Sequence, residues 1–212
     1  MTSLVLVRHG VTDWNENGRL MGRVDLDINA RGRVQAERVA EALADVSIDA
    51  VYSSPQPRAR QTAESVAAAR GLSVHVEPGF DEVWLSDAWK GKTVAELRGD
   101  SDLERIIEDP THRCELIEPI AEVQNRSVAA AERLVETEKE QTLMIVSHGD
   151  PLRVLIAHYL NLELVSFRRL ACDNGSISWI RFNRRGPCLE LLNWVPQSLQ
   201  TGSGKPAALQ SS

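Results

Sequence analysis

The stretch Leu4-Val5-Leu6-Val7-Arg8-His9-Gly10 decides the fold, because a short apolar run passes directly into a cation, an imidazole and a glycine. Such a run, with its β-branched residues, is typical of a strand buried on both faces of a parallel sheet. Packing alone gives a buried strand no reason to end in ionisable residues. Open α/β sheets bind ligands in the crevice beyond the carboxyl ends of their strands. Arg8 and His9 are therefore candidates for a functional site.

Two later stretches repeat this arrangement. Residues 49–52 lead into small polar residues, with Arg58 and Arg60 just beyond, and residues 143–146 lead into His148. Parallel strands end at the same edge of their sheet. The pattern therefore predicts that two histidines and at least one arginine meet at that edge. Arg60 is expected to point elsewhere if Arg58 faces the ligand.

Length and composition limit the possible classes of protein. The chain has 212 residues, 42% hydrophobic and 25% charged, with a formal net charge of −6, which fits one globular domain and argues against a general nucleic-acid binder. The sequence has no apolar run of about 18 residues, so no membrane span is predicted. The N-terminus does not resemble a secretory signal. The chain has 3 cysteines, and their wide spacing favours a location in the reducing cytoplasm. CxxC and HExxH motifs are absent, so no metal site is predicted.

Helical and strand patterns alternate in the first half of the chain. Asn29 is a candidate N-cap for a helix. A second helix is predicted over residues 57–70, with Gly71 as its terminator. Residues 72–76 then alternate in polarity as a strand does.

The second half of the chain shows similar patterns. A helix is predicted over residues 119–138, with Pro119 in its first turn. Another helix follows the strand at 143–146, and for it we predict Asp150 as the N-cap and Pro151 as the first helical residue. Residues 177–194 are predicted to hold an antiparallel strand pair.

Residues 77–118 are the least regular part of the chain. Their two short helical candidates lie at 93–98 and 102–108. An insertion of this kind between a strand and a helix is typical of a lid or a binding wall that sets specificity. We therefore predict one domain over residues 1–195, followed by a polar, flexible tail over residues 196–212.

The residues expected at the sheet edge suit the chemistry of phosphate esters. Arginine binds phosphate oxygens in a bidentate manner. Neighbouring guanidinium charges favour the neutral, nucleophilic form of a histidine, and histidine can form covalent intermediates. Backbone N–H groups of the helix after Gly149 would add partial positive charge. Phosphoryl transfer also needs a proton for the leaving oxygen, and Glu82 in the irregular segment is the candidate donor.

Four stretches together resemble the histidine phosphatase superfamily, whose fold is phosphoglycerate-mutase-like. They read LVRHGVTDWN, YSSPQPRARQTAE, GFDEVWLSDAWKGKT and VSHGDPLRVLI. They occur in the family's order and span nearly the whole domain. The resemblance implies an α/β fold, a three-layer α/β/α sandwich with a mostly parallel central sheet.

The resemblance also implies roles for individual residues. His9 would accept the phosphoryl group, and Arg8, Arg58 and His148 would complete the phosphate pocket. Glu82 falls at the position of the general acid. The resemblance implies that no metal is needed, and we predict no cofactor for a phosphatase of this family. The remaining positions that match the family's phosphate or substrate pocket are Thr12, Asn15, Gly22 and Gly149.

Two segments depart from the family pattern. The acid segment usually reads E-x-x-x-G-x-x-x-G, whereas here the first glycine is missing and Gly91 comes one residue late. Asp81 therefore remains an alternative to Glu82 as the acid. The usual Gly-Gly-Glu-Ser is replaced by residues 116–119, which leaves open whether Glu118 contacts the pocket.

Three functions from different classes are compatible with these residues. The leading hypothesis is a phosphatase that hydrolyses a small phosphorylated metabolite and acts as a monomer or homodimer. A cofactor-dependent phosphoglycerate mutase is the alternative, because residues 12–15 are mutase-like. However, the apolar residues 83–85 stand where mutases of this family carry arginine and tyrosine, which favours the phosphatase. A non-catalytic regulatory module is the third possibility, and the presence of both histidines and both arginines argues against it.

Overall fold

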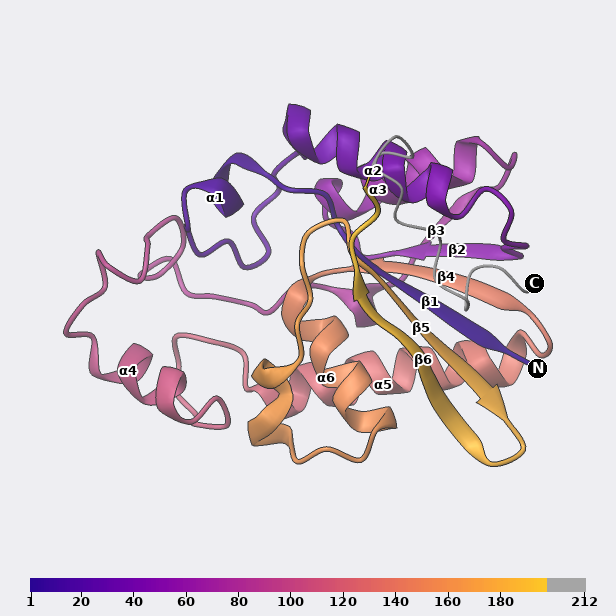
Figure 1. The fold of residues 1–212 in the computed structure, drawn as a ribbon. Coiled ribbons are helices and arrows are strands. Elements are labelled where there is room, and N and C mark those ends of the chain that lie inside the picture. Colours follow the sequence, from indigo (N-terminus) through magenta and orange to yellow (C-terminus); the bar gives the residue numbers. More distant parts are fainter. Residues whose placement is uncertain (198–212) are drawn as a thin grey trace.

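The structure, a computed structural model, describes residues 1–197 and is built on one sheet with the strand order β3-β2-β4-β1-β5-β6 (Figure 1). The pairs β1–β4, β4–β2 and β2–β3 are parallel, whereas β5 pairs antiparallel with both β1 and β6. This arrangement confirms the predicted mostly parallel sheet. The strands are β1 Ser3–Arg8, β2 Ala50–Ser53, β3 Val74–Val76, β4 Thr142–Ser147, β5 Ile177–Asn183 and β6 Gly186–Trp194.

Helices cover both faces of this sheet, which gives the predicted three layers (Figure 1). Helices α2 and α3 lie on one face, and α5 and α6 lie on the other. The α-helices are α1 Asp13–Glu16, α2 Ala30–Ala42, α3 Pro57–Ala68, α4 Ser101–Glu108, α5 Ile120–Thr137 and α6 Gly149–Tyr159. Two 3-10 helices are η1 Pro78–Phe80 and η2 Leu164–Arg169.

The apolar run of β1 is explained by the two cores that these layers create. Leu4 and Leu6 pack into the core beneath α5 and α6, and Val5 and Val7 pack into the core beneath α2 and α3. All four side chains are at most 1% exposed. Burial of each contributes roughly 1.5–3 kcal/mol. β1 is therefore fixed in the sheet, and so is the point at which it delivers the residues that follow it.

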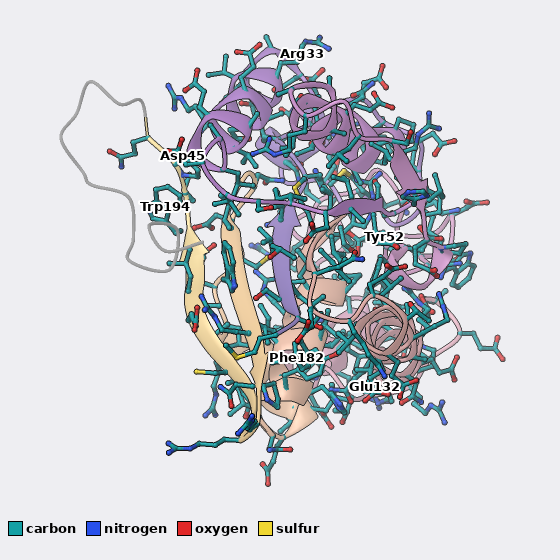
Figure 2. The ribbon with its side chains drawn as sticks, turned by 90° about the vertical axis from the view of Figure 1, so that its right-hand side faces the viewer. Arg33, Asp45, Tyr52, Glu132, Phe182 and Trp194 are labelled. Atoms are coloured by element: carbon teal, nitrogen blue, oxygen red, sulfur yellow. The ribbon has the colours of Figure 1, made fainter. Side chains whose placement is uncertain are left out.

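The same division extends to the antiparallel edge of the sheet. Figure 2 views the molecule from the right-hand side of Figure 1 and shows Phe182 of β5 and Trp194 of β6 on different sides of the sheet. Phe182 packs against the core of α5 and α6, whereas Trp194 packs against the core of α2 and α3. The predicted strand pair at 177–194 is thus confirmed and closes one side of both cores.

Several helix boundaries follow the sequence signals. The side chain of Asn29 caps α2 by accepting a hydrogen bond from the N–H of Gly32 at 3.0 Å, as predicted. Gly71 follows α3 with a φ of +64°, a left-handed conformation that favours glycine after a helix. The helix predicted at 102–108 is α4.

Two helix starts differ from prediction. Pro119 is the N-cap of α5 rather than part of its first turn, because its ψ of 130° is extended. Helix α6 begins at Gly149, and its N-cap is His148 rather than Asp150. The carbonyl oxygen of His148 already accepts from the N–H of Leu152 at 3.2 Å, and the Asp150 carboxylate pairs with a side chain on its own helix instead.

The helix predicted at 93–98 does not form, and this segment makes turns instead. Gly91 and Gly99 bracket it with φ values of +76° and +89°, so the chain reverses at both ends. A cap does form, since Thr93 and Glu96 exchange hydrogen bonds in the manner of a helix start. The space between the glycines is too short for a helix to propagate from it.

Residues 77–118 form a separate structure beyond the carboxyl ends of the parallel strands (Figure 1). They carry their own hydrophobic cluster, distinct from the two cores of the sheet; its buried members are Leu85, Trp89, Leu97, Leu103 and Ile106. The predicted tail at 196–212 lies, from residue 198 onward, outside the described residues.

Candidate active site

His9 lies directly after β1, and its backbone N–H donates to the carbonyl oxygen of Ser147 at 3.0 Å. The imidazole is 0% exposed. Its Nδ1 lies 2.7 Å from the carbonyl oxygen of Gly10. A carbonyl only accepts, so Nδ1 carries the proton and Nε2 carries the lone pair. Nε2 is buried without a hydrogen-bond partner. Burial, followed by the charges of Arg58 and Arg8, lowers the pKa of His9 well below its usual value, which keeps the ring neutral.

The turn after His9 is held by a close approach of two glycines. A Cβ on Gly10 would lie 2.5 Å from the carbonyl oxygen of Gly32, a distance that no side chain can occupy. The N–H of Gly10 donates to Oγ1 of Thr62 at 3.0 Å, which ties the turn to α3. Gly32 and Thr62 were not predicted as site residues. A glycine in the first turn of a helix was the only available signal for Gly32.

The second histidine, His148, is also 0% exposed, and its ring centroid lies 5.0 Å from that of His9. Its Nε2 lies 2.7 Å from Oγ of Ser54 and 3.0 Å from Oε1 of Gln56. Ser54 donates its own proton to Gln56 at 2.6 Å, so Nε2 of His148 is the donor to Ser54. Nδ1 is left buried and without a hydrogen bond. Burial, with the nearby charge of Arg58, lowers the pKa of His148.

Ser54 and Gln56 therefore orient His148, and neither was assigned this role from the sequence. The available signal was the run of small polar residues at the end of the strand that became β2.

Two arginines face the histidines, and each is anchored by part of its guanidinium. Arg58, at the start of α3, is 0% exposed and donates to the carbonyl oxygens of Val24 at 2.7 Å and Gly22 at 2.9 Å. Arg8 donates to the carbonyl oxygen of Cys172 at 2.6 Å. The Nε of each arginine is buried without a partner. Within residues 1–197, the Nε–H of Arg8 and of Arg58 therefore has no protein acceptor and is free to bind an anion.

Arg60 points away from this cluster, as predicted. Its side chain is 50% exposed and lies 3.8 Å from the carboxylate of Glu64, one turn along α3.

Glu82, the candidate acid, lies at the edge of the cluster. Its Oε2 lies 3.6 Å from Nδ1 of His148, and its Oε1 accepts from the N–H of Val83 at 2.9 Å. Burial raises the pKa of Glu82 to about 7, assisted by the charge of Asp150 and opposed mainly by that of Arg58. A carboxyl group with this pKa carries a proton at neutral pH in a large fraction of molecules.

Asp81, the alternative acid, faces away from the histidines. Its carboxylate lies 3.1 Å from Nε of Arg23 and accepts from the N–H of Glu82 at 2.9 Å. The geometry therefore favours Glu82 over Asp81 as the proton donor.

The backbone of the acid segment is held by Arg126 on α5. Its guanidinium donates to the carbonyl oxygens of Gly79 at 2.9 Å, Asp81 at 2.7 Å and Glu82 at 3.1 Å. Three carbonyl groups close together in sequence are thus fixed by one planar cation. Arg126 was not singled out from the sequence, because no local pattern shows which loop a helix residue will reach.

Glu118 completes this support rather than contacting the histidines. Its carboxylate receives hydrogen bonds from Arg126 at 2.9 and 3.1 Å, from Arg23 at 2.9 Å and from the N–H of Trp84 at 3.1 Å. The sequence left open whether Glu118 contacts the pocket. Its carboxylate instead binds residues on either side of Glu82.

The other predicted pocket residues occupy different places. Asn15, Gly22 and Gly149 line the cavity at the site, together with Arg8 and Glu82. Gly149 packs against Arg8, because a Cβ there would lie 3.5 Å from the guanidinium carbon.

Thr12 is not among the residues that line this cavity. Its hydroxyl group caps α1, accepting from the N–H of Asn15 at 3.2 Å. Asn174, which was missed, donates to the carbonyl oxygen of His9 at 3.0 Å and lies 3.4 Å from Oδ1 of Asn15. It precedes β5 in a loop that carries no recognisable motif.

The part of the chain that the structure describes, residues 1–197, also limits the possible metal and membrane sites. Within that range, no group of three or more His, Cys, Asp or Glu side chains is placed to hold a metal ion. None of the helices described there is both long and apolar enough to cross a membrane.

Comparison with known proteins places this arrangement in a family. The model of the histidine phosphatase superfamily (branch 1) matches residues 4–195. Phosphoserine phosphatase 1 of Hydrogenobacter thermophilus is 34% identical over 91% of this chain and 92% of its own length. A probable phosphoglycerate mutase, GpmB, of Erwinia tasmaniensis is 32% identical over 84% of each chain.

A solved structure gives the same result for the fold. The crystal structure of phosphoserine phosphatase from Entamoeba histolytica in complex with 3-phosphoglyceric acid superposes with a TM-score of 0.83. It is 29% identical, and the match covers 92% of this chain and 98% of that one. The chain therefore belongs to the histidine phosphatase superfamily, branch 1, and is a phosphoric monoester hydrolase.

Proposed function

We propose that this enzyme hydrolyses a small-molecule phosphomonoester in two steps, through a phosphohistidine on Nε2 of His9. One observation carries the proposal: Nε2 of His9 is buried and unpartnered while Nδ1 is held by the carbonyl oxygen of Gly10. The lone pair is thereby directed into a cluster that also holds the unpartnered Nε of Arg8 and of Arg58. A neutral nucleophile among fixed cations suits attack on a phosphate ester.

In the first step, the Nε2 lone pair of His9 forms a bond to phosphorus while the bond from phosphorus to the ester oxygen breaks. The leaving oxygen takes the electron pair and accepts the proton of the Glu82 carboxyl group, so the alcohol leaves neutral. Arg8, Arg58 and the first N–H groups of α6 stabilise the phosphoryl oxygens. The negative charge of the bound phosphoryl group also favours protonation of His148, whose Nδ1 then becomes a further donor.

In the second step, the Glu82 carboxylate accepts a proton from water. The water oxygen forms a bond to phosphorus, the bond from phosphorus to Nε2 breaks, and its electron pair returns to His9. Inorganic phosphate leaves, and both His9 and Glu82 regain their starting protonation states. The reaction thus consumes one ester and one water and yields one alcohol and one phosphate.

Trapping the intermediate tests the proposal. A radiolabelled phosphomonoester mixed with the enzyme and quenched rapidly should leave label on His9, stable to alkali and lost in acid. His9→Ala should abolish the label and lower kcat/KM by about 10⁴-fold or more. His75→Ala, at an exposed histidine on β3, is the matched control and should retain both. Undiminished turnover in His9→Ala, or label on another residue, would overturn the proposal.

A phosphoglycerate mutase is the second candidate, favoured by the similarity to GpmB. A mutase must keep its phosphoenzyme from water and bind a second anionic group. The apolar residues Val83 and Leu85 in the cavity wall support the hydrolase instead. An assay of 3-phosphoglycerate with and without bisphosphoglycerate separates the two, since only a mutase yields 2-phosphoglycerate.

The proposal includes a small phosphorylated metabolite as the partner, no nucleic acid and a cytoplasmic location. Cys114, Cys172 and Cys188 are free, which supports a reducing compartment. Either a monomer or a homodimer is expected, and sedimentation would identify which.

A further inference from the structure

Two catalytic candidates, Arg8 and Glu82, line a cavity that continues away from them along an apolar wall. Its volume is about 360 Å³. Asn15, Glu82 and Gly149 line it where it meets the phosphate site. The apolar lining from the insertion consists of Val83, Leu85, Trp89, Val94, Leu103, Ile106, Ile107 and Ile117. A substrate whose phosphate reached His9 would therefore place its alcohol portion against aliphatic side chains.

Most of this wall is rigid, because it is also the surface of a packed cluster. Leu85, Leu103 and Ile106 are at most 7% exposed and pack around Trp89, which is 1% exposed. The indole N–H of Trp89 donates to Asp100 at 3.0 Å, which fixes the centre of the cluster. A wall built in this way exists before any ligand binds, so little ordering free energy is spent on binding.

Two apolar side chains at the cavity are instead open to solvent. Val94 is 49% exposed and Ile107 is 52% exposed. Both line the cavity that leads to Arg8 and Glu82. Exposed aliphatic groups beside a ligand site gain free energy when an apolar part of the ligand covers them.

The arginines along this cavity, other than Arg8, are already engaged by the protein. Arg19 donates to the carbonyl oxygen of Gly91 and lies 3.6 Å from Glu96. Arg153 donates to the carbonyl oxygen of Leu170 at 2.9 Å.

Arg153 makes a second hydrogen bond within the protein, and Arg168 makes one. Arg153 also donates to Asp150 at 3.1 Å. Arg168 donates to the carbonyl oxygen of Ile106 at 2.7 Å. Each of these arginines keeps further N–H donors, so the apolar side chains, rather than a lack of cations, distinguish this part of the cavity.

We propose that residues 83–117 form an apolar leaving-group subsite, and that the substrate is a phosphomonoester whose alcohol carries an alkyl or aryl group. This inference rests on the proposed phosphatase function and specifies its substrate class. It differs from what the names of the phosphoserine and phosphoglycerate relatives state for those proteins.

A series of straight-chain alkyl phosphates tests the subsite directly. Ethyl, butyl and hexyl phosphate have leaving groups of nearly equal basicity, so the chemistry is held constant while the apolar length changes. We expect kcat/KM to rise by up to about fourfold for each added methylene, the value of a buried CH₂. O-phosphoserine should be a poorer substrate than ethyl phosphate.

The two possible failures are distinguishable. If all the alkyl phosphates are hydrolysed at equal rates, or O-phosphoserine is preferred, the subsite is wrong and the phosphatase mechanism stands. If no phosphomonoester is hydrolysed, the proposed function itself fails.

Variants at the two exposed positions give a second measurement. Ile107→Gln and Val94→Gln should flatten the dependence of kcat/KM on chain length, and both variants should fold, because exposed positions tolerate polar side chains. Val34→Gln is the matched control, because Val34 is 43% exposed on α2 and does not line this cavity. An unchanged slope in both subsite variants would overturn the inference. The inference would also be overturned if the enzyme were a dimer that dissociates in both variants, because Val94 and Ile107 would then be covered by the second copy of the chain.

Discussion

The phosphate site and the insertion at 77–118 are built in different ways. The phosphate site takes its groups from the ends of strands and the starts of helices, and His9, Arg58 and His148 are each 0% exposed. The insertion joins the rest of the fold through Phe80 and Val83, which pack beneath α5 and α6, and through hydrogen bonds from Arg126, and it also holds a small cluster of its own. The histidines and arginines of the site thus depend on the sheet, whereas the apolar wall of the cavity depends on the insertion.

The largest effect that sharpens this contrast is expected at Glu82, the one catalytic candidate that the insertion supplies. Glu82→Gln should lower kcat/KM for ethyl phosphate by about 10²–10⁴-fold, because the alkoxide then leaves without a proton. For 4-nitrophenyl phosphate, whose leaving group needs no proton, the loss should be much smaller. Steady-state assays of both esters measure this difference, and equal losses would contradict the assignment of Glu82 as the acid.

A strong effect is also expected on the side of the sheet. Arg58→Ala should reduce kcat by about 10²–10³-fold, the usual effect of removing one fixed donor to transition-state charge. Arg60→Ala is its control on the same helix and should change kcat by less than about twofold. Circular dichroism must accompany the assay, because Arg58 also holds the carbonyl oxygens of Gly22 and Val24. A folded Arg58→Ala enzyme with full activity would remove Arg58 from the mechanism.

The pH dependence should reflect the raised pKa of Glu82, which is about 7. A carboxyl group donates its proton only while protonated, which means below its pKa. The kcat/KM for ethyl phosphate should therefore fall on the alkaline side, by about tenfold per pH unit above the pKa. In Glu82→Gln this limb should vanish. A limb that persists in the variant would have to come from another group.

A smaller effect is expected where the two regions are joined. Glu118→Gln weakens the ion pairs with Arg23 and Arg126 and so loosens the acid segment. We expect kcat for ethyl phosphate to fall by about tenfold, a loss of roughly 1.4 kcal/mol in transition-state stabilisation. A positioning role also requires a smaller loss for 4-nitrophenyl phosphate and a shifted alkaline limb. A general loss of folding would lower both rates equally.

The smallest effect should come from within the insertion cluster. Leu97 is 7% exposed and belongs to the cluster but does not line the cavity. Leu97→Ala removes packing behind the apolar wall of the cavity, so the wall should contact the substrate less tightly. We expect kcat/KM for hexyl phosphate to fall by roughly fourfold, which corresponds to the loss of about one methylene contact. The inhibition constant of inorganic phosphate should stay unchanged. A weaker affinity for phosphate would show that the two regions are not independent.

The same contrast explains what could be predicted from the sequence. The strand ends that carry His9 and His148 were predictable, because a buried parallel strand is a continuous apolar run and its last residue marks the sheet edge. The placement of Arg58 followed from its position just after such a run. These are local patterns, and the sheet converts them into proximity.

The remaining site residues are not visible in local patterns. Arg126 reaches the acid segment from the middle of α5, and Asn174 reaches His9 from a loop. Gly32 is required because Gly10 approaches it from elsewhere in the chain. Each of these contacts joins segments that are distant in sequence, so only the assembled fold brings them together. Asp150 was a plausible cap by residue type, but the extended backbone of His148 starts the helix earlier.

The complete burial of His9 has a consequence for the kinds of molecule that this enzyme can treat. A phosphorylated serine or tyrosine on the surface of a folded protein is tethered to a broad backbone, and that bulk must stop at the mouth of the cavity. The imidazole of His9 is itself 0% exposed. We therefore expect small free esters to be hydrolysed faster than phosphorylated side chains on folded proteins.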